Sequence, residues 1–219
     1  MVFLFGCLAL VGCTFEIDSL KSVFQGLPSM VPNTAMAFML AGLSLGLKRT
    51  ESAGTVTRRT AKAFAVIVVL IGAFTLCEYL LDWEPGIDRL LFGETLSKLP
   101  TPIPGRPAFL TALNFLFLGL ALLLLDLKSR YHSRPVELLT ATAILISLLA
   151  LIGYACNVPF FYTWTSLFPN TGMALHTSMA FTLLGAGILC VRPDQGLMGI
   201  VTSPTASGPR ANEPATRER

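Results

Sequence analysis

Apolar residues along the chain gather in six runs, and the segments between the runs hold most of the charged residues. The runs cover residues about 1–15, 33–47, 61–81, 107–125, 136–156 and 173–191. A helix that crosses a bilayer needs roughly 20 mostly apolar residues, with a range of about 17–25. The last four runs fit this length, the second fits once the apolar residues before it are included, and the first is short. The pattern predicts an all-α integral membrane protein with six transmembrane helices.

The second, fourth and sixth runs contain the same ten-residue motif, with Thr in the first place, Phe in the fifth and Gly in the ninth. The copies are TAMAFMLAGL at 34–43, TALNFLFLGL at 111–120 and TSMAFTLLGA at 177–186. Each motif opens the second helix of a pair, and the pairs cover about 1–47, 61–125 and 136–191. The sequence therefore predicts three repeated helix pairs within a membrane domain at residues 1–199.

The three shared residues of each motif are predicted to lie on one stripe of their helix, because positions i, i+4 and i+8 fall within about 40° of one another. The stripes are Thr34, Phe38 and Gly42; Thr111, Phe115 and Gly119; and Thr177, Phe181 and Gly185. In membranes, Gly allows helix backbones to approach closely, and Thr can form hydrogen bonds to its own or a neighbouring helix. The stripes are therefore interpreted as helix-packing surfaces, with a ligand role for the threonines as the alternative.

The basic residues predict the orientation of the helices. Of the 16 Lys and Arg residues, 12 fall in segments 48–62, 126–137 and 192–219, on one side of the predicted membrane, and 4 fall on the other. Since cytoplasmic loops are enriched in Lys and Arg, both termini are predicted to be cytoplasmic and the membrane to be a bacterial inner membrane. We call the opposite side the outer side.

Composition agrees with a lipid environment and bears on the two chain ends. The chain is 53% hydrophobic and 13% charged, whereas soluble domains carry about 25% charged residues. The net charge of +3 is spread over the loops, so no nucleic-acid partner is expected. Residues 200–219 are rich in Pro, Ser, Ala and charge, which predicts a disordered cytoplasmic tail. The first run starts at Met1 with no cytoplasmic flank, and we expect that the natural protein begins further upstream.

Three polar residues near the outer ends of predicted helices are candidates for a binding site. Asn114 takes the fourth motif place, where the other copies have Ala37 and Ala180, and His176 directly precedes the third motif. Glu78 lies near the outer end of the third helix. Since polar groups inside a membrane usually face protein or water, Glu78, Asn114 and His176 could form a small-molecule or proton-sensing pocket. The alternative is that Glu78 reaches the lipid headgroups and His176 caps its helix.

Sequence patterns of catalysis and cofactor binding are missing from the chain. His132 and His176, the two histidines, fall on opposite sides of the predicted membrane, which makes a bis-His haem implausible. The sequence contains no Walker loop, no H-E-x-x-H and no Gly-rich dinucleotide turn. Its five cysteines include no C-x-x-C pair. We therefore expect no catalytic residues, no cofactor and no metal site.

Several stretches together resemble a known family. They are LKSVFQGLPSMVPNTAMAFMLAGLSL at 20–45, EYLLDWEPGIDRLLFGE at 78–94, GRPAFLTALNFLFLGLALLLLD at 105–126, GMALHTSMAFTLLGAGIL at 172–189 and RPDQGLMGIVTS at 192–203. They resemble the N-terminal multi-pass membrane sensor module of bacterial signalling proteins, which precedes PAS, histidine-kinase or diguanylate-cyclase domains. The resemblance implies a signal-input domain that acts on a cytoplasmic kinase or cyclase effector, although this chain has no phosphoacceptor or nucleotide site of its own.

Two other functions stay open on the sequence. Internal repeats are common in transporters, so a small-solute or lipid transporter is one alternative, against which few polar residues fall at mid-membrane depth. A membrane packing subunit without a ligand is the other. The lipid bilayer is the expected surrounding in each case, and a second copy of the chain is a further candidate partner.

Overall fold

The computed structural model describes residues 6–7, 30–49, 54–81, 106–125, 130–163 and 172–191, with the backbone alone described at 130–134. These residues form five α-helices and one short 3-10 helix: α3 (Pro32–Lys48), α4 (Thr55–Leu80), α6 (Phe109–Leu124), α7 (Arg130–Ala155), η1 (Pro159–Phe161) and α8 (Leu175–Leu189). The all-helical class is confirmed for the described part of the chain. Most of the first predicted helix and the predicted tail at 200–219 lie outside the described residues.

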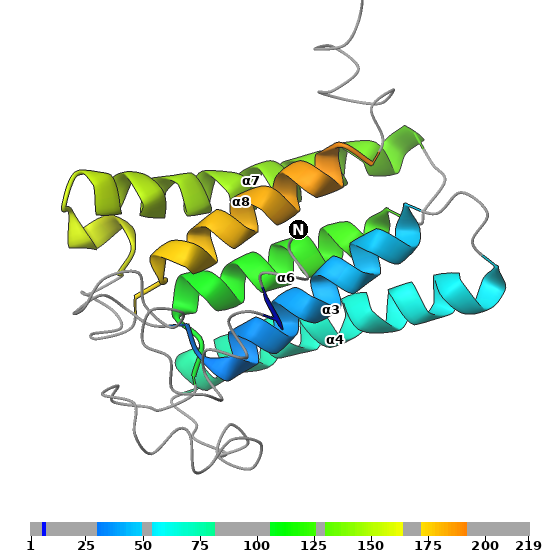
Figure 1. The fold of residues 1–219 in the computed structure, drawn as a ribbon, viewed down its shortest axis with the longest axis horizontal. Helices are drawn as coiled ribbons and strands as arrows, with labels where there is room; N and C mark the ends of the chain where they lie inside the picture. Colours follow the sequence, from blue (N-terminus) through cyan, green and yellow to red (C-terminus); the bar gives the residue numbers. More distant parts are fainter. Residues whose placement is uncertain are drawn as a thin grey trace, which may run out of the picture.

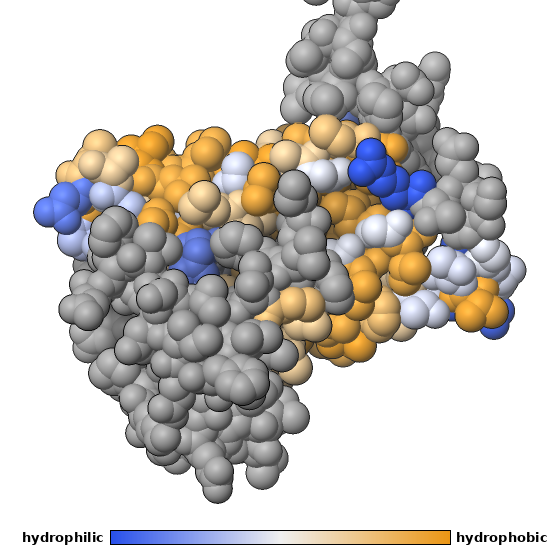
Figure 2. Space-filling view, in the orientation of Figure 1, coloured by the Kyte–Doolittle hydropathy of each residue, from blue (hydrophilic) through white to orange (hydrophobic). Residues whose placement is uncertain are grey.

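Two of the helices are long and apolar enough to cross a membrane, namely Thr55–Leu80 and Pro135–Ala155. Helices α6 and α8 are apolar but shorter, because each begins two residues before its motif Thr and the residues ahead of it are extended rather than helical. Six transmembrane helices are therefore not confirmed. In both long helices only 33% of the apolar window is buried. Their apolar side chains thus face outward, unlike those of a core helix in a soluble protein, and Figure 2 shows apolar residues over much of the surface.

The three motif helices α3, α6 and α8 run in one direction, while α4 and α7 run in the opposite direction (Figure 1). Helix α4 packs between α3 and α6, and α7 packs between α6 and α8. The three motif helices also contact one another. As a result, each described pair has one motif helix near the centre of the bundle and one long helix toward its outside.

The three motif helices begin at the same register. Their N-cap residues are Val31, Ala108 and Ala174, each of which is three residues before the motif Thr. The caps share an extended conformation, with ψ values of 151°, 151° and 150°. None of them forms a side-chain capping hydrogen bond. The repeated sequence thus produces a repeated helix start, with Thr as the third helical residue.

The centre of the bundle is a cluster of three phenylalanines, one from each motif helix. Phe38, Phe115 and Phe181 are all 0% exposed. Their ring centroids lie 4.9, 4.6 and 4.7 Å apart, with interplanar angles of 61°, 53° and 67°. Inclined rings at this spacing attract one another by about 0.5–1.5 kcal/mol per pair beyond area burial. We call this cluster the Phe triad, and it places a pseudo-threefold axis through the motif helices.

Glycines bring the outer helices onto the motif helices in the first two pairs. A Cβ atom added at Gly72 of α4 would lie 2.8 and 2.7 Å from backbone atoms of α6, and one added at Gly6 would lie 3.0 Å from the equivalent backbone atoms of α3. In both pairs the atoms are the carbonyl oxygen of the residue after the motif Thr and the nitrogen of the residue after the motif Phe: Ala112 and Leu116 in α6, Ala35 and Met39 in α3. Gly6 and Gly72 therefore make the same contact with the backbones of their motif helices.

The motif glycines make close contacts with the outer helices rather than with the axis. A Cβ atom at Gly119 would lie 3.1 Å from the backbone nitrogen of Val69 in α4, and one at Gly185 would lie 2.9 Å from Cδ1 of Ile144 in α7. Gly42 is half-buried. Within each stripe, Thr and Phe are thus buried near the centre of the bundle. Gly119 and Gly185 instead allow the long helix of the same pair to pack closely against the motif helix.

Adding a methyl group at Gly72 should destabilise the bundle. In Gly72→Ala the new Cβ would meet the α6 backbone, which cannot move aside as a side chain would, and we expect a loss of about 1–3 kcal/mol. Gly46→Ala is the control, because a Cβ atom there has nothing within 4 Å and alanine favours a helix. Thermal unfolding in detergent compares the two variants. Equal melting temperatures would show that the close contact between α4 and α6 is not needed.

Candidate functional site

Buried polar residues gather at the end of the bundle where the motif helices begin and where α4 and α7 end (Figure 1). We call it the outer end. The three motif threonines are each 2% exposed, and the other polar residues there are at most 8% exposed: Asn33, Glu78, Arg106, Asn114, His176 and Ser178. This set includes all three residues of the predicted pocket.

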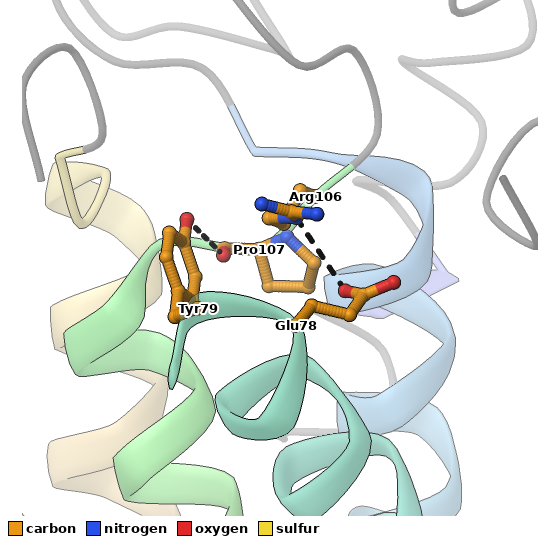
Figure 3. A network of polar contacts seen from close by, with 4 residues as sticks. All are labelled: Glu78, Tyr79, Arg106 and Pro107. Atoms are coloured by element: carbon orange, nitrogen blue, oxygen red, sulfur yellow. Dashed lines mark hydrogen bonds and ion pairs between the residues drawn. The ribbon is translucent and has the colours of Figure 1, made fainter. Parts of the chain in front are cut away.

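An ion pair joins the end of α4 to the segment before α6. Glu78 Oε2 lies 3.5 Å from Nε of Arg106, and the two side chains are 3% and 4% exposed (Figure 3). The Arg106 guanidinium also lies over the Tyr79 ring, with its Cζ 5.2 Å from the ring centroid, a favourable cation–π arrangement. Glu78 is therefore buried against an arginine and does not reach outward. The sequence predicts Arg106 only as a basic residue of an outer loop, and its pairing with Glu78 is seen only in the structure.

Tyrosines clamp the two described pairs in the same way. The Tyr79 hydroxyl donates a hydrogen bond to the Pro107 oxygen over 3.0 Å, and the Tyr154 hydroxyl donates to the Met173 oxygen over 2.6 Å. Both acceptors are four residues before the motif Thr. The two clamps are thus equivalent, and they were not predicted from the sequence. They tie each long helix to the start of its own motif helix.

This equivalence shows where the second and third pairs differ. Gly153 precedes Tyr154 as Glu78 precedes Tyr79, which agrees with the sequence correspondence of L-C-E-Y and I-G-Y. A Cβ atom at Gly153 would lie 2.7 Å from Cβ of Phe161 and 3.0 Å from the oxygen of Val158. The segment around η1 therefore fills the space that a larger side chain would need. In the third pair, packing of this turn replaces the ion pair of the second.

Asn114 lies deeper, one turn below the outer end, and links two pairs. Its Nδ2 donates to Oγ of Ser147 on α7 over 2.9 Å, and that hydroxyl donates to the Ala143 oxygen over 2.8 Å. Asn114 is 0% exposed, and its Oδ1 has no hydrogen-bond partner in the described part of the chain. A buried polar group left unpaired costs about 1–3 kcal/mol. The residue therefore fixes α6 against α7 and keeps an acceptor available.

His176 is the second residue of α8 and is 6% exposed. Its Nε2 is buried and has no hydrogen-bond partner among the described residues. The alternative in which His176 caps α8 is wrong, because the N-cap of this helix is Ala174 and no side-chain capping bond is formed. The imidazole is thus a second buried polar group at the outer end with an unused atom.

The three predicted pocket residues share one end of the bundle but hold different partners. Glu78 pairs with Arg106, Asn114 bonds to Ser147, and His176 Nε2 is unpaired. Among the residues that the structure describes, no hydrogen bond or ion pair joins any two of these three side chains. The described residues also contain no group of three or more His, Cys, Asp or Glu side chains arranged to hold a metal ion. The arrangement suits recognition of a polar group.

Comparison with family models, with curated proteins and with solved structures found no match for this chain. Function is therefore inferred from the molecule's own features. Those features are a repeated bundle around the Phe triad, an apolar outer surface, and buried polar residues at one end, of which Asn114 Oδ1 and His176 Nε2 have no hydrogen-bond partner among the described residues.

Removing one charge of the buried ion pair should destabilise the protein strongly. Glu78→Gln leaves the Arg106 charge buried without its carboxylate, and breaking a buried pair in this way costs about 3–5 kcal/mol. The double variant Glu78→Gln/Arg106→Gln should recover most of this loss, because no uncompensated charge remains. Glu137→Gln, which changes a half-buried carboxylate in α7, is the control. Unfolding measured in detergent would contradict the expectation if the single and double variants were equally unstable.

Proposed function

We propose that this chain is the membrane-embedded signal-input module of a bacterial signalling protein. A cue at the outer end would change how the three motif helices pack, and their opposite ends would pass that change to a cytoplasmic kinase or cyclase effector. The observation that carries the proposal is that Asn114 Oδ1 and His176 Nε2, buried above the Phe triad, have no hydrogen-bond partner among the described residues. Leaving such a buried atom unpaired costs about 1–3 kcal/mol.

Exposed apolar side chains support the membrane location. Leu70 on α4 is 60% exposed, and Leu138 and Leu145 on α7 are 68% and 57% exposed. In water such a surface would favour aggregation, whereas lipid chains solvate it. Figure 2 shows hydrophilic residues toward the two ends of the bundle and apolar ones between them. A bilayer around the middle of the bundle accounts for this distribution.

Basic residues support the proposed orientation in an inner membrane. Arg58, Arg59 and Lys62 are exposed near the start of α4, at the end of the bundle opposite the polar cluster. Lys48 and Arg49 lie at the adjacent end of α3. Because basic residues stay on the cytoplasmic side, this end would face the cytoplasm and the polar cluster would face the periplasm.

The Phe triad gives the proposed signal a route. Each motif helix is continuous from its N-cap at the outer end, through its Phe, to its opposite end. A tilt or rotation at the outer end therefore moves the opposite end as well. A cue can shift such a bundle only if it binds one packing arrangement better than another. The incompletely paired Asn114 and His176 supply groups whose interactions could differ between two arrangements.

A transporter is less well supported by the same features. The Phe triad closes the axis directly below the motif threonines, with ring centroids 4.6–4.9 Å apart. Transporter sites commonly use helices broken near mid-membrane, whereas the described helices are continuous there. A solute would therefore need the core of the bundle to open before it could cross.

Reporter fusions test the orientation. Reporters joined after Arg59 and after Arg130 should be active as cytoplasmic fusions, and one joined after Gly93 should be periplasmic. The physical reason is the excess of basic residues on one side. A periplasmic signal at Arg59 would reverse the orientation and remove the proposed input from the outer side.

A chimera tests signal input. With the module joined to a reporter kinase, output should respond to periplasmic pH or to added solutes, and Glu78→Gln and His176→Gln should change that response. Gly46→Ala should respond like the wild type, because that residue faces open space. The kinase output is measured together with the amount of folded protein. If both polar variants respond like the wild type to every effective cue, the polar cluster has no input role.

A further inference from the structure

The start of α8 has several hydrogen-bond donors without acceptors. Its first backbone hydrogen bond runs from the Ser178 N–H to the Ala174 oxygen over 3.1 Å. The N–H groups of Leu175, His176 and Thr177 therefore have no intrahelical acceptor. The N-cap is an alanine, and the first turn contains no acidic residue. This helix end has a partial positive charge of about half a unit, with no described side chain to offset it.

Helix α3 begins at the same register as α8, but the N–H groups of its first turn differ from those of α8. Pro32 is its first residue and has no N–H. The Thr34 N–H donates to the Val31 oxygen over 3.0 Å. In addition, the buried Glu78 carboxylate extends from α4 toward α3 (Figure 3). At the start of α3, Pro32 removes one donor and a carboxylate lies nearby, whereas the first turn of α8 contains neither a proline nor an acidic residue.

The His176 side chain gives a second, independent observation at the start of α8. It belongs to the same first turn, is 6% exposed, and its Nε2 has no hydrogen-bond partner among the described residues. Buried polar atoms in proteins nearly always have a partner. The imidazole nitrogen and the N–H groups without an intrahelical acceptor belong to the same helical turn.

We propose that the first turn of α8, with His176, binds the carboxylate of a small organic acid that enters from the outer side. When Nε2 bears the ring proton, it donates to one carboxylate oxygen, and the N–H groups of the first turn donate to the other. This inference rests on the proposed function and names the chemical class of its cue. It adds a binding group and a ligand class to the polar cluster.

Charge favours a carboxylate over a phosphate. The cation at the outer end in the described part of the chain is Arg106, and Glu78 already pairs with it. A helix end offers only about half a positive charge, which suits a monoanion better than a dianion. The Phe triad below the first turns limits the depth of the site, so the rest of a larger acid would extend outward.

Burial of His176 also links binding to a change in structure. At 6% exposure the imidazole is enclosed, and an acid can reach it only if the covering residues move. The ligand would therefore bind a more open arrangement of the outer end and increase its population. Such a shift is what a signal-input module requires.

Nitrogen NMR tests the proposal directly, because the chain has only two histidines. The full chain in nanodiscs, labelled with nitrogen-15 at histidine, is titrated with sodium acetate and with sodium butyrate at fixed pH and ionic strength. His132→Gln assigns the two sets of signals and serves as the matched control. The Nε2 signal of His176 should shift and saturate, while the His132 signals should not change.

Parallel titrations with sodium chloride and sodium phosphate establish the ligand class. Equal shifts with chloride, a saturable shift with phosphate alone, or no saturable shift with either acid would overturn the proposal. His176→Gln, followed by the shift in melting temperature, should bind the acids about tenfold more weakly. If that variant does not fold, the wild-type titration still decides.

The chimera described above separates this inference from the proposed function. Saturable carboxylate binding without any change in reporter output would support the site and contradict the signalling function. A chimera that responds to another cue, together with no carboxylate binding, would support signal input and overturn the carboxylate site.

Discussion

Contact among three phenylalanines is the constraint on which the rest of this bundle depends. Phe38, Phe115 and Phe181 are fully buried, and each lies seven residues after the N-cap of its helix. Because the rings meet at one level, the three helix starts are also held at one level. In the membrane location proposed for this chain, apolar burial would do little to hold the helices together, because lipid chains are as apolar as leucine. Ring packing and close backbone contacts would then supply most of the cohesion.

Because the three motif helices start at one level, several energetically unfavourable groups lie close together at the outer end. Three helices start there without side-chain caps, and the start of each carries a partial positive charge. The molecule offsets them differently in each pair. Glu78 and Arg106 form a buried ion pair beside α3 and α6, while in α8 the Nε2 of His176 has no hydrogen-bond partner in the described part of the chain. The three motif helices have the same arrangement but carry different polar residues. A ligand bound at their outer end would therefore have one preferred orientation.

Residues that differ between the repeats therefore indicate function better than the residues that the repeats share. The motif threonine, phenylalanine and glycine explain packing, and the tyrosine clamps at Tyr79 and Tyr154 repeat in two pairs. Asn114 in place of alanine, Glu78 in place of glycine, and His176 depart from the repeat. Asn114 bonds to Ser147 and Glu78 pairs with Arg106, whereas His176 Nε2 has no partner among the described residues. Each of them is nevertheless buried. Selection of a bundle for packing alone would favour apolar residues at these positions.

The sequence by itself determined the helical class, the approximate position of each described helix, the common start of the motif helices and the polar residues near one end. These follow from local rules, since apolar runs and a repeated motif fix which segments are helical and which residues share a face. Tertiary structure alone decided that Arg106 pairs with Glu78, that Asn114 bonds to Ser147 on the next pair, and that Tyr79 and Tyr154 clamp their pairs. It also decided the lengths of α6 and α8, which are shorter than their apolar runs. The physical reason is that partners across helices depend on the rotation and depth of each helix, and these are set by the Phe triad and the glycine contacts rather than by neighbours in the chain.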